Sequence, residues 1–201
     1  AQNTEAIVEK APADIREKIN DSVEKCFMQW NDEVKLHGSM QEQCAEFFDN
    51  VEKIPVEKRY PLIKKEFYYE AAVLSRMIAH RERVRALNAL SEKYDVRFYT
   101  FDKNTTVLSE QVKVCPGIKH DGGISCVYRD AKINLNITLH CIDTGACQRI
   151  FDVMASGGFM LSNYQAELEE LFEVGKEIVL YHNEEEMMQL VDYYLAHEKE
   201  R

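Results

Sequence analysis

The chain has 201 residues, 45% of them hydrophobic, and a formal net charge of -10. Such a chain can bury a core in one or two domains, and its acidity argues against a nucleic-acid partner bound through phosphate contacts. No apolar run approaches the roughly 18 residues of a membrane span, and residues 1–10 lack the charged-then-apolar order of a signal peptide. The sequence therefore predicts a cytoplasmic protein without a membrane span.

Helical periodicity dominates residues 1–93. Apolar residues recur at helical spacing over 14–38 and 40–51, and a longer helical pattern covers 62–93. The basic run from His80 to Arg85 near the end of this segment is more typical of a solvated helix face or a domain contact than of a phosphate site. We therefore predict a helical segment without a catalytic constellation.

The pattern changes to alternation of apolar and polar residues from residue 94 onward. Strands are expected at 96–101, 112–115, 133–138, 159–161 and 177–181, and helices at 145–154, 166–172 and after Asn183, with a helical turn after Gly123. This order predicts an α/β domain over residues 94–201, a Rossmann-type parallel sheet of about five strands. Ligands of such sheets bind beyond the carboxyl ends of the strands.

The cysteines and histidines suggest no metal site. The six cysteines contain no C-x-x-C pair, and no two histidines stand four residues apart on an expected helix. Reduced core thiols are the favoured interpretation of Cys26, Cys44, Cys115, Cys126, Cys141 and Cys147.

Two familiar nucleotide-binding motifs are missing. The turn after the first expected strand, residues 101–104, has no glycine, so the dinucleotide fingerprint is absent, and no P-loop occurs. The residues disfavour an NAD-dependent enzyme or a kinase, and we expect no permanently bound cofactor.

Four stretches of the second half carry a family resemblance. They are KINLNIT at 132–138, QRIFDVMASGGFML at 148–161, YQAELEELFEVGKEIV at 164–179 and EEMMQLVDYYLAH at 185–197. With them, residues 131–201 resemble the carboxyl-terminal domain of GT-B glycosyltransferases, and most closely the CgeB-like group, named for a spore-maturation protein. The resemblance implies a UDP- or GDP-sugar as donor, and an unidentified acceptor bound across a cleft by a separate amino-terminal domain.

The helix over 145–154 supplies most of the expected donor contacts. Asp143, Thr144 and Gly145 precede it, where unpaired N–H groups can face a diphosphate. Arg149 is the natural counter-charge, and Asp152 occupies the place where wider GT-B families carry a ribose-binding Glu. An exposed i, i+3 ion pair between Arg149 and Asp152 is the alternative. Thr144 stands where many retaining relatives carry the first of two glutamates, which leaves the stereochemical outcome open.

Other candidates follow from position along the expected strands. Asn136, Thr138 and His140 approach the ligand edge, and His140 is the candidate catalytic group, although a lone histidine at a strand end is more often structural. Tyr164 lies in the loop after the 159–161 strand, at the same edge. Gly157 and Gly158 permit close backbone approach or simply end the helix.

The leading expectation is the donor-binding domain of a glycosyltransferase, as part of a longer two-domain enzyme. One alternative is a nucleotide-binding module without catalysis, suggested by Thr144 and by the lack of a second α/β unit. A protein-interaction module that docks through residues 1–93 is the other.

Overall fold

The computed structural model describes residues 13, 17, 21, 68–102, 105–139 and 145–201. The chain divides into two compact units, one made of residues 81–138 and 144–201, the other of 1–80 and 139–143. The second of these is described only at three helical positions, at Leu139 and at the start of helix α5 (Tyr68–Ser91). The helices expected over 14–38 and 40–51 lie, apart from two of those positions, outside the described residues.

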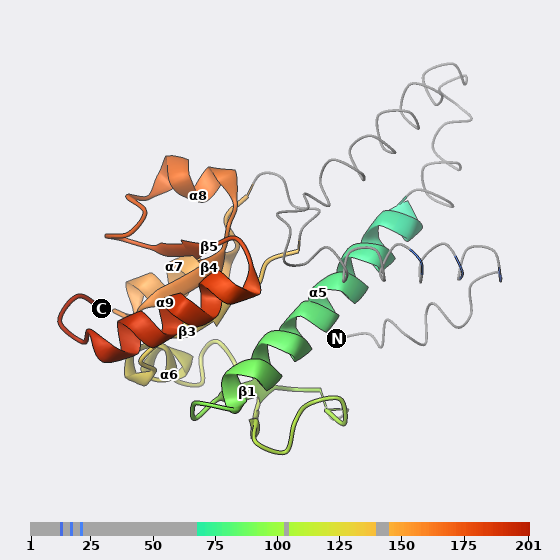
Figure 1. Cartoon of the computed structure of the whole chain (residues 1–201), viewed down its shortest axis with the longest axis horizontal. Helices are drawn as coiled ribbons and strands as arrows, with labels where there is room; N and C mark the ends of the chain where they lie inside the picture. Colours follow the sequence, from blue (N-terminus) through green and yellow to red (C-terminus); the bar gives the residue numbers. More distant parts are fainter. Residues whose placement is uncertain (1–12, 14–16, 18–20, 22–67, 103–104, 140–144) are drawn as a thin grey trace. The chain divides into compact units, whose positions relative to one another are not determined.

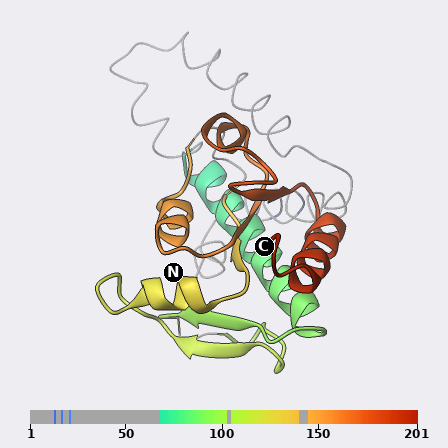
Figure 2. The ribbon, with the colours of Figure 1, turned by 90° about the vertical axis from the view of Figure 1, so that its left-hand side faces the viewer.

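Within the described part of the first unit, five parallel strands form the sheets, and the sequence predicts about this number. Strand β1 (Arg97–Thr100) pairs with β2 (Lys113–Pro116), and β3 (Asn134–Asn136) pairs with β4 (Met160–Asn163), which pairs with β5 (Val179–Tyr181). The strands belong to a two-stranded and a three-stranded sheet instead of one continuous sheet. Figure 2 shows β1 and β2 side by side.

Helices cover both faces of the three-stranded sheet (Figure 1). On one face, α5 and α9 (Glu184–Ala196) contribute Ala86, Leu90, Met187 and Val191 to a buried cluster with residues of all three strand regions. On the other, α7 (Gln148–Ala155) and α8 (Ala166–Leu171) contribute Ile150, Val153 and Leu168. The result is the α/β layering expected of a Rossmann-type domain. The turn expected after Gly123 is a longer helix, α6 (Ile124–Asp130).

The helical spacing of apolar residues predicts that Phe151 and Leu171 face the core, but both residues are exposed. The side chain of Phe151 is 46% exposed and that of Leu171 is 50% exposed, whereas Ile150, Val153 and Leu168 are fully buried. On α7 the inward face is set by the i, i+3 pair Ile150 and Val153, which turns Phe151 to the rim against Phe172. On the six-residue helix α8, Leu168 is buried, whereas the last residue, Leu171, is exposed.

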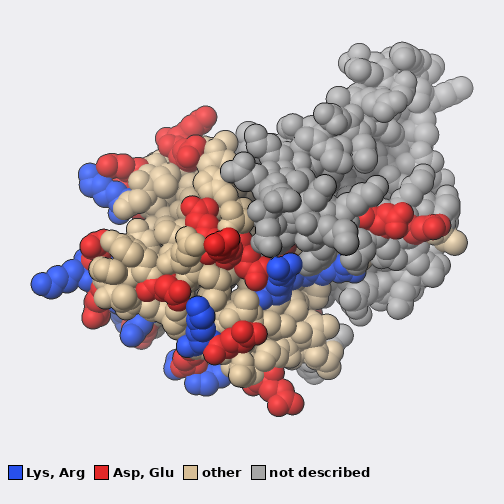
Figure 3. Space-filling model, viewed as in Figure 1, with Lys and Arg blue, Asp and Glu red and all other residues tan. Residues whose placement is uncertain are grey.

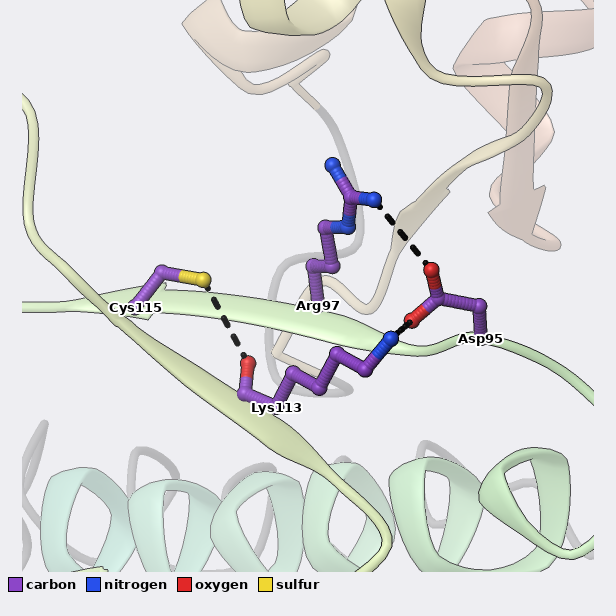
Figure 4. A network of polar contacts seen from close by, with 4 residues as sticks. All are labelled: Asp95, Arg97, Lys113 and Cys115. Atoms are coloured by element: carbon purple, nitrogen blue, oxygen red, sulfur yellow. Dashed lines mark hydrogen bonds and ion pairs between the residues drawn. The ribbon is translucent and has the colours of Figure 1, made fainter.

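A carboxylate bridges the two strands of the smaller sheet. Asp95 accepts a hydrogen bond from Arg97 at 3.2 Å and lies 2.7 Å from Nζ of Lys113 (Figure 4). The hydrogen bond from Lys113 is the main reason that the pKa of Asp95 is lowered. The bridge links β2 to the residues that lead into β1.

The described cysteines are free thiols, as predicted, but not core residues. Cys126 is exposed, and Cys115 and Cys147 are half-buried. Two of them lie on short surface elements, Cys115 on the exposed strand β2 and Cys126 on α6, which has no buried residue. Cys26, Cys44 and Cys141 lie outside the described residues.

Charge is mixed over the described surface. Acidic and basic side chains intermingle on the described part of the face in Figure 3. Among the described residues, no helix combines the length and the apolar character that crossing a membrane requires.

Candidate functional site

Asn136, the last residue of β3, is the centre of a buried polar network. Its side chain is 1% exposed, and its Nδ2 donates to Oγ1 of Thr138 at 2.9 Å and to Oγ of Ser162 at 3.0 Å. The register places Asn136 beside Ser162 on β4. Both amide hydrogens are therefore satisfied inside the fold, which fixes the orientation of the amide oxygen.

A second asparagine extends the pairing of β3 and β4 beyond the last ladder residues. Oδ1 of Asn163 accepts from the main-chain N–H of Thr138 at 2.7 Å, and its Nδ2 donates to the Thr138 carbonyl at 3.2 Å. The amide thus takes the place of a main-chain partner just beyond the end of β3. This is how the backbone polar groups of Thr138 are satisfied although the residue is buried.

The amide oxygen of Asn136 connects the strand ends to helix α7. It accepts from the Cys147 thiol at 3.4 Å and from Nη1 of Arg149 at 3.2 Å. Cys147 is the N-cap residue of α7 and makes no side-chain cap hydrogen bond. The amino end of the helix and the cation in its first turn are therefore held at the carboxyl end of β3.

Arg83 of helix α5 reaches the same place. Its Nη2 donates to the main-chain oxygen of Ile137 at 2.8 Å, one residue beyond Asn136. Burial, and next the charge of Arg149, lower the pKa of Arg83, while the charge of Glu82 acts in the opposite direction. Two guanidinium groups from different helices therefore contact neighbouring residues at the end of β3.

The sequence interpretation missed Arg83 by treating the basic run 80–85 as a solvated helix face or a domain contact. A usable signal was present, because Arg83 follows Ala79 by four residues and precedes Ala86 by three. Both alanines are fully buried, and this spacing places Arg83 on the same face of the helix. Arg85 of the same run instead forms an ion pair with Glu184 at 2.5 Å.

Asp152 does not pair with Arg149. Its carboxylate lies 3.9 Å from Nδ1 of His120, which belongs to the segment between β2 and α6. The ion pair that the spacing left open between Arg149 and Asp152 is not among the ion pairs of the described residues. Arg149 and Asp152 therefore contact different residues, Asn136 and His120 respectively.

Tyr164 lies just after β4, at the carboxyl edge of the sheet, with an exposed ring. Its main-chain N–H donates to the Tyr181 carbonyl at 2.8 Å, and its ring stacks on His182 with centroids 4.6 Å apart. The Tyr164 hydroxyl donates to Glu169 at 2.9 Å. The edge of β4 and β5 thus presents a fixed aromatic surface flanked by a carboxylate.

The remaining candidates lie elsewhere. Gly145, with φ 121°, belongs to the approach to α7, and His140, Asp143 and Thr144 lie outside the described residues. Gly157 and Gly158 precede β4, at the amino ends of the strands, away from the network. A Cβ on Gly158 would lie 2.5 Å from the Tyr128 carbonyl oxygen, so this glycine permits the close approach of α6.

The network is suited to holding an anion. It consists of two guanidinium groups, neutral amides, hydroxyls and one thiol around the carboxyl ends of parallel strands. The part of the chain that the structure describes contains no group of three or more metal-ligating side chains.

Comparison with known proteins gives one match. The model of a family described as "Glycosyl transferase-like" matches residues 81–201, the stretch that begins where the described unit begins. Neither the curated proteins nor the solved structures gave a match.

Proposed function

The chain belongs to this glycosyl transferase-like family, and from that membership we propose that residues 81–201 bind the nucleoside diphosphate sugar from which the glycosyl group is transferred. Transfer of a sugar requires a donor and an acceptor. The groups at the carboxyl ends of β3, β4 and β5 are suited to binding the donor. The observation that carries the proposal is the position of Arg149, held by the buried Asn136 beside the amino end of α7.

The chemistry of the leaving group explains why a cation belongs there. When the bond between the sugar and the diphosphate breaks, negative charge accumulates on the diphosphate, and a fixed guanidinium stabilises that charge without having to reorganise. The amino-terminal turn of α7 adds N–H groups that face the same side. The resemblance to GT-B enzymes supports Asp152 as the group for the ribose hydroxyls and Tyr164 as part of the donor surface.

The same resemblance supports an acceptor held by a second domain across a cleft, since closure of two domains normally completes such sites. The CgeB-like group is the one that the quoted motifs favour. Under this proposal, residues 81–201 alone bind donor but transfer little or no sugar.

Isothermal titration of the 201-residue chain with UDP and GDP tests the donor site. Replacing Arg149 by Ala should weaken the binding of the nucleoside diphosphate far more than that of the nucleoside, because a charge-assisted contact contributes about 1.5–3 kcal/mol. Asp152→Asn should weaken nucleoside and nucleotide about equally, because it acts on the ribose. Failure of both nucleotides to bind, or unchanged affinity in both variants, would remove this edge as the donor site.

A further inference from the structure

Two arginines converge on neighbouring acceptors of the same strand end. Arg83 donates to the carbonyl oxygen of Ile137 at 2.8 Å, and Arg149 donates to Oδ1 of Asn136 at 3.2 Å. One arginine comes from α5 and the other from α7, 66 residues later in the chain. Because both contacts use one terminal nitrogen of a guanidinium that carries five N–H donors, each arginine keeps donors for a ligand.

The charges of this pair are only partly balanced. The acceptors that hold the two guanidinium groups are a main-chain carbonyl and an amide, both neutral. Burial and the charge of Arg149 lower the pKa of Arg83, and the charge of Glu82 opposes this less strongly. The charges of Arg83 and Arg149 therefore repel each other. An anion bound between them would relieve that repulsion.

We propose that Arg83 and Arg149 form a two-arginine site for the diphosphate of the donor, with Arg83 as a binding residue that the family resemblance did not indicate. This inference rests on the proposed function. A diphosphate carries charge on two adjacent phosphoryl groups. Two guanidinium groups held by neighbouring acceptors therefore match a diphosphate better than they match a single phosphate. Arginine forks bind phosphate oxygens in a bidentate manner, which adds geometric selectivity.

Titration of the full chain with inorganic pyrophosphate tests the pair without any contribution from base, ribose or sugar. Arg83→Gln and Arg149→Gln should each weaken the binding of pyrophosphate at least tenfold. Orthophosphate should bind the unmutated chain at least tenfold more weakly than pyrophosphate. Arg85→Gln is the matched control, because Arg85 lies on the same helix and pairs with Glu184. This variant should stay within twofold of the unmutated chain.

The thiol of Cys147 provides a second measurement that does not depend on variants. Its Sγ donates to the same oxygen of Asn136 as Arg149 does, and the residue is half-buried, whereas Cys126 is exposed. Pyrophosphate should slow alkylation of Cys147 by iodoacetamide, followed by peptide mass mapping, and leave Cys126 unaffected. If Arg83→Gln fails to fold, Arg83→Lys with this protection assay replaces it, and the expected result is weaker protection of Cys147.

The outcomes separate the inference from the proposed function. An Arg83→Gln chain that melts at a lower temperature but binds pyrophosphate and UDP or GDP normally would overturn the inference, since Arg83 would then only support the Ile137 carbonyl, while the donor site would stand. Pyrophosphate binding that depends on both arginines, with UDP and GDP unable to compete, would uphold the arginine pair and overturn the nucleotide proposal. Absence of pyrophosphate binding and of protection at Cys147 would reject the arginine pair.

Discussion

Replacing Asn136 by alanine should loosen the three-stranded sheet more than any other single polar substitution in the network. The change removes the hydrogen bonds that Nδ2 donates to Thr138 and Ser162, both buried. Each such bond contributes about 0.5–1.5 kcal/mol, and the loss is larger where a buried partner is left unsatisfied. Adding a small cavity term, we expect a loss of about 2–4 kcal/mol. The contact with Arg149 adds little, because that side chain is exposed.

Hydrogen exchange of peptides from β3, β4 and β5 is the suitable assay, because it reports this unit separately from residues 1–80. A loss of about 2–4 kcal/mol corresponds to exchange that is roughly 30- to 700-fold faster. Thr138→Val removes one of the hydrogen bonds and nearly preserves the side-chain volume. It should reduce the stability of the sheet by about 1 kcal/mol. Exchange within threefold of the unmutated chain in Asn136→Ala would refute the view that this amide organises the strand ends.

Three further substitutions have outcomes set by local geometry. Gly158→Ala should destabilise by about 1–3 kcal/mol because its Cβ meets the Tyr128 carbonyl at 2.5 Å, and thermal melting should show Gly157→Ala, with φ 75° but open space, as the milder change. Asn183→Ala should cost about 0.5–2 kcal/mol, since Asn183 accepts the Glu186 N–H at 2.9 Å, and Asn183→Ser should recover most of it in the same melting assay. Tyr181→Phe should move alkaline unfolding, followed by circular dichroism, to higher pH. Burial raises the pKa of Tyr181 in the folded chain, so this residue contributes stability below its unfolded pKa of about 10 that is lost as pH rises further; an unchanged midpoint would contradict that assignment.

The order of helices and strands after residue 94 was predictable because periodicity is a local property. The β3, α7, β4 block and the Asn183 cap lie within a few residues of their expected positions. The division into two sheets was not predictable, because strand pairing depends on long-range register that no local pattern encodes. The exposed Phe151 and Leu171 show the same limit on a smaller scale, since helical spacing identifies an apolar stripe but not which side of it meets the sheet.

The candidate site was predictable only where a residue acts near its own strand or helix. Arg149 follows from its position in the first turn of α7, and Asn136 from its place at the end of β3. Arg83 contacts a carbonyl 54 residues away. Asn163 contacts the main chain of Thr138, 25 residues away, in place of a strand neighbour. Contacts of this kind depend on how α5 and β4 pack, so the sequence pattern alone could suggest a face but no partner.

An amide at position 136, instead of a carboxylate, has a consequence for charge. Asn136→Asp keeps the shape, and the hydroxyls of Ser162 and Thr138 can rotate to donate to the new carboxylate, so exchange of β3 should change by less than tenfold. The carboxylate would, however, pair with Arg149 and neutralise part of the charge that the arginine pair offers to a ligand. We therefore expect pyrophosphate to bind Asn136→Asp at least tenfold more weakly, in titrations run beside Asn136→Ala. Equal affinity of the aspartate variant and the unmutated chain would show that the neutral acceptor at this position serves the fold alone.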